Sequence, residues 1–156
     1  MEFAQTPSRH SERREKSPHF TKVYQPGWKR ISKLLNGDPT AARVWVFLVE
    51  NAGHDNVLAC SMAVLEEELN LHRKTISKKI GYLRDEGALQ VAKMGTANVY
   101  ILNPHETWKA SEEFKNYHAI TARALIGESE NKGLRKRLTH MVKHADQADL
   151  FEDEKH

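Results

Sequence analysis

Apolar residues recur at helical spacing in the first third of the chain. Trp28, Ile31 and Leu35 lie three and four residues apart, and Asn-Gly-Asp-Pro at 36–39 is typical of a helix end followed by a new start. A second helix is predicted from Thr40 to Ala52, because the apolar stripe there is wide enough for a well-buried helix. That stripe comprises Val44, Trp45, Phe47, Leu48 and Val49.

A pair of helices follows a short β-type run at residues 56–60. Ser61 is placed to cap the first helix, Met62–Leu69, through its hydroxyl. After a tight turn, the second helix is predicted from Arg73 to Glu86, with Gly87 as its left-handed stop. A mid-helix glycine costs about 1 kcal/mol relative to alanine, so we expect Gly81 to allow close packing against the helix at 40–52. The predicted inward residues are Leu65, Leu69, Ile76, Ile80 and Leu83.

Two strand-like runs, Leu89–Lys93 and Asn98–Leu102, predict a β-hairpin whose turn is Met94–Ala97. Pro104 ends the hairpin. The remaining helical patterns are Ser111–Leu125 and Lys132–Val142.

The order helix, short strand, helix, tight turn, helix and hairpin is that of a winged helix-turn-helix domain. The fold class is therefore mainly α with a small β-hairpin (α+β), extended by further helices at both ends. Residues 1–19 are too polar to offset their ordering entropy, so we expect a disordered arm. The rest divides into residues 20–110, a winged-helix domain with its leading helix, 111–144, a C-terminal helical extension, and 145–156, an acidic flexible tail.

The formal net charge of +3 hides an uneven distribution, because basic residues gather in two runs and the tail is acidic. Basic patches on a chain whose total charge is offset elsewhere indicate a polyanionic partner. The first run holds Arg73, Lys74, Lys78, Lys79 and Lys93, and the second holds Lys132, Arg135, Lys136, Arg137 and Lys143.

The outer face of the helix at 73–86 carries the charge and hydroxyl groups that DNA recognition needs. Such a face enters a major groove about 12 Å wide, where cations meet phosphates or guanine edges and small hydroxyls allow close approach. The predicted DNA-binding residues are Arg73, Lys74, Thr75, Ser77, Lys78 and Lys79 on the helix, with Lys93 and Thr96 at the hairpin. The alternative is a merely solvated charged face. The acidic preceding helix and the Lys and Thr of the hairpin favour DNA.

Several kinds of site have no support in the sequence. Cys60 is the only cysteine, which excludes an intrachain disulfide and a cysteine zinc cluster. His140 and His144 are four residues apart but lack a third ligand, so we predict no metal site. No phosphate-binding loop and no nickase-type histidine pair is present, so we predict no enzyme activity and no cofactor. Without a signal or membrane-spanning segment, the expected location is the cytoplasm.

Part of the chain, roughly residues 40–110, resembles the RepL-like plasmid replication proteins. The helix-turn-helix half of the likeness is generic, whereas the hairpin sequence Gly-Thr-Ala-Asn-Val-Tyr and the two dipeptides after it are more specific. The resemblance implies a winged-helix initiator that recognises a plasmid origin and recruits host replication proteins, with no established catalytic residue. His72 departs from the Ser or Thr cap common in such helices. The matching residues are 57–61, 65–69, 73–77, Tyr82, Leu83, Gly87, 95–100, Asn103, Pro104, Trp108 and Lys109.

The acidic tail contains a short motif similar to the peptide that binds bacterial sliding clamps. In Gln147-Ala148-Asp149-Leu150-Phe151, Leu150 and Phe151 would fill an apolar cleft while the Gln147 amide bonds at its rim. Ala148 departs from the usual Leu-like residue and predicts weaker binding. The alternative is an ordinary tail whose apolar residues fold back onto the core.

Together these features predict a plasmid replication initiator that binds double-stranded origin DNA. A transcriptional repressor, which needs no clamp motif, is the alternative, and a metal-dependent nickase fits least well. A symmetric dimer is expected, with the Trp28 helix or the Ser111–Leu125 helix as its interface.

Overall fold

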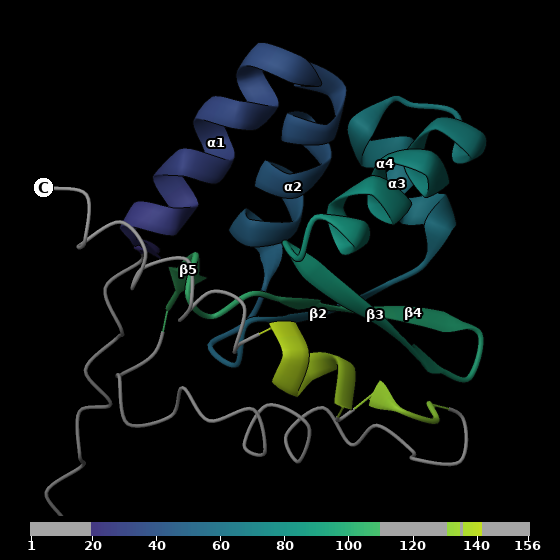
Figure 1. Cartoon of the computed structure of the whole chain (residues 1–156). Helices are drawn as coiled ribbons and strands as arrows, with labels where there is room; N and C mark the ends of the chain where they lie inside the picture. The colour runs from purple at the N-terminus through teal and green to yellow at the C-terminus, as the bar shows by residue number, and fades with distance from the viewer. Residues whose placement is uncertain (1–19, 110–130, 135, 142–156) are drawn as a thin grey trace, which may run out of the picture.

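The computed structural model describes residues 20–109, 131–134 and 136–141. Four helices lie on one face of a small antiparallel sheet, and the segment at 131–141 lies on the opposite face (Figure 1). The arm at 1–19, the predicted helix Ser111–Leu125 and the acidic tail lie outside the described residues. The helices are α1 (Gln25–Gly37), α2 (Pro39–Asn51), α3 (Met62–Leu69) and α4 (Arg73–Asp85), and the strands are β1 (Lys22–Val23), β2 (Val57–Cys60), β3 (Leu89–Met94), β4 (Ala97–Leu102) and β5 (Thr107–Trp108).

The break between α1 and α2 lies where the sequence predicted it. Asp38 is the N-cap of α2, and its Oδ1 accepts a hydrogen bond from the Ala41 N–H at 3.0 Å. The face that α1 buries differs from the apolar spacing, however. Leu34 is 1% exposed, whereas Trp28 and Leu35 are 55% and 59% exposed. The spacing therefore located the helix but not its inward side.

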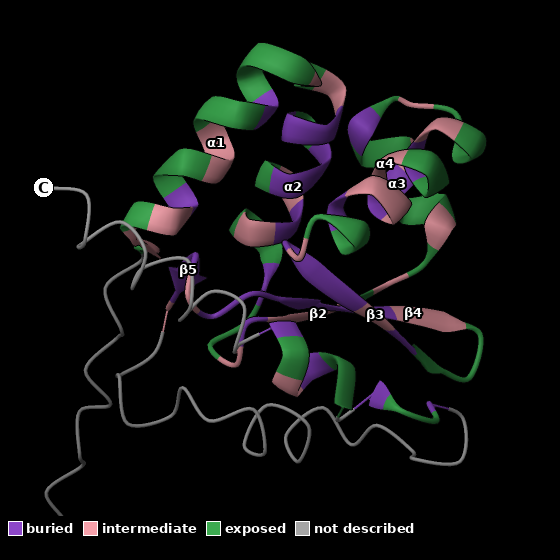
Figure 2. Cartoon of the chain, in the orientation of Figure 1, coloured by how far each residue is buried: buried purple, intermediate pink, exposed green. Residues whose placement is uncertain are grey.

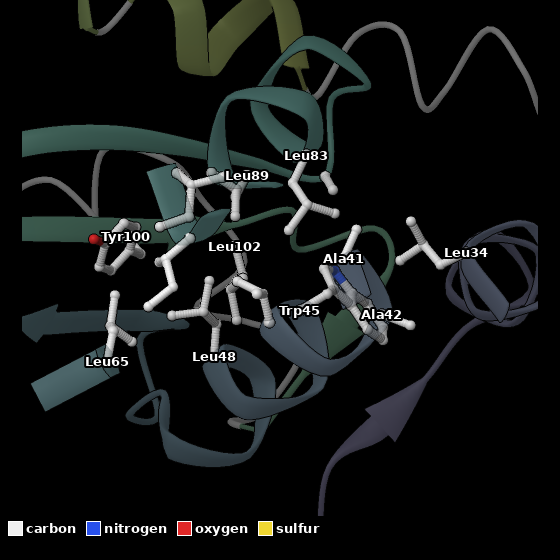
Figure 3. Packing of buried hydrophobic residues seen from close by; sticks show 14 of the residues in the cluster. Leu34, Ala41, Ala42, Trp45, Leu48, Leu65, Leu83, Leu89, Tyr100 and Leu102 are labelled. Atoms are coloured by element: carbon white, nitrogen blue, oxygen red, sulfur yellow. The ribbon is translucent and has the colours of Figure 1, made fainter. Parts of the chain in front are cut away.

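The main core lies between α2, α3, α4 and the sheet. Figure 3 shows Leu48, Leu65, Leu83 and Tyr100, one from each of these four parts of the fold, packed in this core. All five inward residues predicted for α3 and α4 are buried. The predicted cap of α3 is also confirmed, since Ser61 Oγ accepts a hydrogen bond from the Val64 N–H.

Gly81 does not have the packing role expected of it. A Cβ placed there would meet only the Arg84 side chain, 3.9 Å away, among the described residues. The predicted close approach to α2 is therefore wrong, and nothing described explains a glycine at this position. Gly87, by contrast, has a φ of +77° and ends α4 as predicted.

The larger sheet has the strand order β2-β4-β3, with every neighbour antiparallel. Leu89 pairs with Leu102 and Met94 with Ala97, so the hairpin turn is only Gly95-Thr96, shorter than predicted. Gly95 has a φ of +61°, the conformation that a two-residue hairpin turn requires.

The other face of this sheet is covered by the segment at 131–141, where Leu134 and residues 136–141 are helical. This helix starts two residues later than the predicted Lys132. Leu134, Leu138 and Met141 pack with Trp108 and with outward residues of the sheet in a second apolar cluster. The two-residue pairing of β1 with β5, which places Trp108 there, was not predicted. Within the described residues, no helix combines the length and apolar character needed to cross a bilayer.

Candidate nucleic-acid interface

The outward side of α4 carries most of the predicted DNA-binding residues. Arg73, Lys74, Ser77 and Lys78 are exposed and Thr75 is half-buried, while the opposite side of the helix is packed in the core (Figure 2). The helix therefore presents a basic side to solvent while its apolar side is fixed in the core.

The start of α4 is held by His72. Its Nδ1 accepts a hydrogen bond from the Lys74 N–H at 3.3 Å, so this histidine serves as the N-cap in place of Ser or Thr. The turn before it is fixed from α2, because Arg43 Nη2 donates to the Leu69 carbonyl oxygen at 2.6 Å. Asn70 then adopts a left-handed conformation, with a φ of 50°. The basic end of α4 is thus set in place by α2 and α3.

Lys79 differs from the other predicted residues of α4. Its side chain is only 21% exposed, and Nζ donates to Asp38 Oδ2 at 2.9 Å. This hydrogen bond lowers the pKa of the Asp38 carboxyl, although burial acts in the opposite direction. Sequence spacing placed Lys79 with the outer cations, whereas the structure joins it to the α1–α2 junction. Its contact fastens α4 to the N-terminus of α2.

The hairpin presents the last two predicted residues. Lys93 and Thr96 are both exposed near its tip (Figure 2). The main chain of Lys93 is held by the Asn131 side chain: the Lys93 N–H donates to Asn131 Oδ1 at 2.7 Å, and Asn131 Nδ2 donates to the Lys93 carbonyl at 2.8 Å. The hairpin is therefore fastened to the C-terminal segment along its outer edge.

Several cations on this surface are unpaired. Lys74, Lys78 and Lys93 form no ion pair with any described residue, and Arg73 has only a long contact of 3.7 Å with Glu66. Several other described arginines and lysines have carboxylate or carbonyl partners, as Lys33 has with Glu86. Uncompensated positive charge on one helix and the adjoining hairpin is the arrangement that attracts phosphates.

A buried ion pair joins α1 to the end of α4. Arg30 Nε contacts Glu106 Oε1 at 2.6 Å, and Arg30 Nη2 donates to the Glu86 carbonyl, at the C-cap of α4, at 2.8 Å. Glu106 Oε2 has no hydrogen-bond partner among the described residues. Burial raises the pKa of Glu106 to about 7, although the Arg30 charge and hydrogen bond act in the opposite direction. This pair could not be predicted from local patterns, because its members are 76 residues apart.

The raised pKa of Glu106 predicts a pH-dependent stability. The folded-state pKa of Glu106 lies above the ordinary value of 4.5, so the folded protein holds the proton on this carboxyl more tightly than the unfolded chain does. The stability that this proton adds is fully present below pH 4.5 and is lost as the pH rises through about 7. The free energy of unfolding of the wild type, relative to Glu106→Gln, should therefore fall between pH 4.5 and pH 7.5, by on the order of 3 kcal/mol. Urea denaturation of both proteins across this range measures the difference. A difference that is constant, or that grows with pH, would contradict the prediction.

Other residues noted in the sequence do not form a second site. Among the described residues, no three His, Cys, Asp or Glu side chains are placed to hold a metal ion. Cys60 is half-buried, and burial raises the pKa of its thiol, with a smaller contribution from the charge of Glu68. His144 and the clamp-like residues Gln147, Asp149, Leu150 and Phe151 lie outside the described residues.

The comparison with protein families agrees with the likeness seen in the sequence. A family model described as Firmicute plasmid replication protein (RepL) matches residues 8–150, which include every described element of the fold. A search among curated proteins gave no match. The family match covers most of the 156 residues, so the chain belongs to the RepL family of Firmicute plasmid replication proteins.

Proposed function

We propose that this chain initiates plasmid replication by binding origin DNA through a winged helix-turn-helix domain. In this proposal α3 and α4 are the helix-turn-helix pair, and the β3–β4 hairpin is the wing. The observation that carries it is the unpaired charge of Lys74, Lys78 and Lys93 on α4 and the hairpin. Membership in a plasmid replication family supports a role at the origin.

The proposed docking follows from the geometry of α4. Its N-terminal residues are the ones that contact base edges when a recognition helix enters the major groove. We therefore assign base contacts to Arg73, Lys74 and Ser77, and a phosphate contact to Lys78. Lys93 and Thr96 on the wing would contact the flanking backbone. Lys79 keeps a structural role through its bond to Asp38.

Initiation and repression share this DNA chemistry, and plasmid maintenance separates them. The test places the reading frame with its flanking DNA on a replicon that has no other origin, then interrupts the frame. An initiator requires the intact frame, so the plasmid should be lost and should return when the protein is supplied in trans. A replicon that is maintained after the interruption, with increased expression of the frame, would instead establish a repressor.

The purified chain should neither nick this DNA nor hydrolyse ATP, and origin-specific nicking would overturn the non-enzyme proposal.

A symmetric dimer on the DNA is part of the proposal. Two-fold related copies would protect two half-sites about 34–36 Å apart, one turn of the duplex. Trp28 and Leu35 of α1 are among the exposed apolar residues that the structure describes, and they support α1 as the interface. Footprinting of the bound fragment decides this, because a single unrepeated site would contradict the dimer.

Recruitment of the host sliding clamp through Gln147, Asp149, Leu150 and Phe151 completes the proposal. Its support is the sequence of this motif together with the replication family. Replacing Leu150 and Phe151 with Ala should impair plasmid maintenance and leave DNA binding unchanged. Normal copy number in a chain truncated after His144 would contradict the clamp contact.

A further inference from the structure

The C-terminal segment carries a second set of unpaired cations. Residues 131–141 contain no Asp or Glu. Lys132, Lys136 and Arg137 are exposed, and none of them forms an ion pair with a described residue. Arg137 Nη1 donates only to the Lys132 carbonyl, at 3.2 Å, within the segment itself. Within the part of the chain that the structure describes, this charge is therefore as uncompensated as that of α4.

The segment is fixed to the hairpin that forms the proposed wing. The Asn131 side chain makes two hydrogen bonds to the main chain of Lys93, in β3 at the outer edge of the sheet. Immediately after it, Leu134, Leu138 and Met141 are buried against the sheet. Figure 1 shows the start of the segment beside the hairpin and its helix running back beneath the sheet. Lys132 thus follows directly after Asn131, whose side chain is hydrogen-bonded to Lys93 of β3.

We propose that Lys132, Lys136 and Arg137 form a second phosphate-binding surface, which contacts the duplex flanking the site that α4 reads. The proposal rests on the proposed function, because α4 and the wing must first hold the DNA. Lysines without carboxylate partners bind phosphates as point charges and carry no base information. The surface would therefore extend the contact with DNA beyond the wing, independently of the flanking sequence.

The test compares two duplexes. One is trimmed to the base pairs that α4 and the wing cover, and the other is extended on both sides by a full helical turn. In fluorescence anisotropy, Lys132→Gln combined with Lys136→Gln should reduce the log–log salt slope on the extended duplex by about two, roughly one per lost phosphate contact. Affinity and slope on the trimmed duplex should be unchanged. Lys29→Gln with Lys33→Gln removes the same charge from α1, across the sheet from the segment, and should alter neither slope.

Asn131→Ala removes no charge, so it tests whether the two hydrogen bonds between Asn131 and Lys93 are needed for the second phosphate contact. It should also reduce the slope on the extended duplex, in a protein whose binding to the trimmed duplex is retained. Arg137 is left in place in every variant because of its bond within the segment.

The outcomes separate this inference from the proposed function. If the double lysine variant keeps the wild-type slope on the extended duplex, the second surface is wrong. The proposed function then still stands, provided that α4 variants lose binding to both duplexes. If the wild-type chain binds neither duplex, the proposed function fails and this inference fails with it.

Discussion

Replacing Lys74 and Lys78 with Gln should greatly weaken specific DNA binding and leave the fold intact. Both side chains are exposed, and neither has an ion-pair partner among the described residues, so their removal breaks no ion pair there. Loss of a base contact costs about 1–3 kcal/mol, roughly a 5- to 150-fold fall in affinity at the cognate site. Loss of a phosphate contact should lower the salt slope by about one for all sequences. Binding titrations with the origin fragment and an unrelated duplex measure both effects.

Lys79→Gln is the matched control, since it removes one charge from the same helix. Lys79 is bonded to Asp38, so this variant should lose thermal stability while its salt slope stays that of the wild type. If the Lys74 and Lys78 variant binds the origin as well as the wild type, α4 is not the recognition helix.

The second large effect that we expect is a loss of stability when Trp108 is replaced. Trp108 is fully buried in the apolar cluster that joins β5, the sheet and the C-terminal segment. Trp108→Ala should lower the free energy of unfolding by about 3–5 kcal/mol, because a large cavity replaces the indole. That loss is a large fraction of the 5–15 kcal/mol typical of a whole domain, so the midpoint of unfolding should fall markedly.

Trp28→Ala provides the comparison for the same chemical change at an exposed position. Its side chain is half-exposed on α1, so substitution should cost much less than at Trp108. Urea denaturation monitored by circular dichroism gives both values. Equal costs for the two variants would show that the second apolar cluster contributes no special stability.

The helices and the hairpin were predictable because their signals are local. Ile76, Ile80 and Leu83 show the inward side of α4 directly, since a buried stripe recurs every three to four residues. Ser61 and Gly87 marked helix ends through their own hydrogen-bonding and backbone preferences. These features need no knowledge of what lies across the molecule.

The parts that sequence reasoning missed depend on contacts between distant segments. The strands β1 and β5 are two residues each, too short for any alternation, and they exist because they pair with each other. Lys79 is on the same helix as Lys78, and only the position of Asp38 at the α1–α2 junction separates their roles. The same holds for Asn131, whose bonds to Lys93 span 38 residues. Charge on a helix was predictable, but which charges are already paired was not.

The salt dependence of DNA binding by the full chain tests most directly whether this basic surface holds phosphates. With about 6–8 phosphates neutralised, the logarithm of the association constant should fall against the logarithm of salt concentration with a slope of roughly −5 to −7. Anisotropy titrations of the origin fragment across a range of salt concentrations give this slope. A nearly flat dependence would mean that the exposed lysines of α4 and the hairpin are merely solvated, and that DNA binding through this surface is wrong.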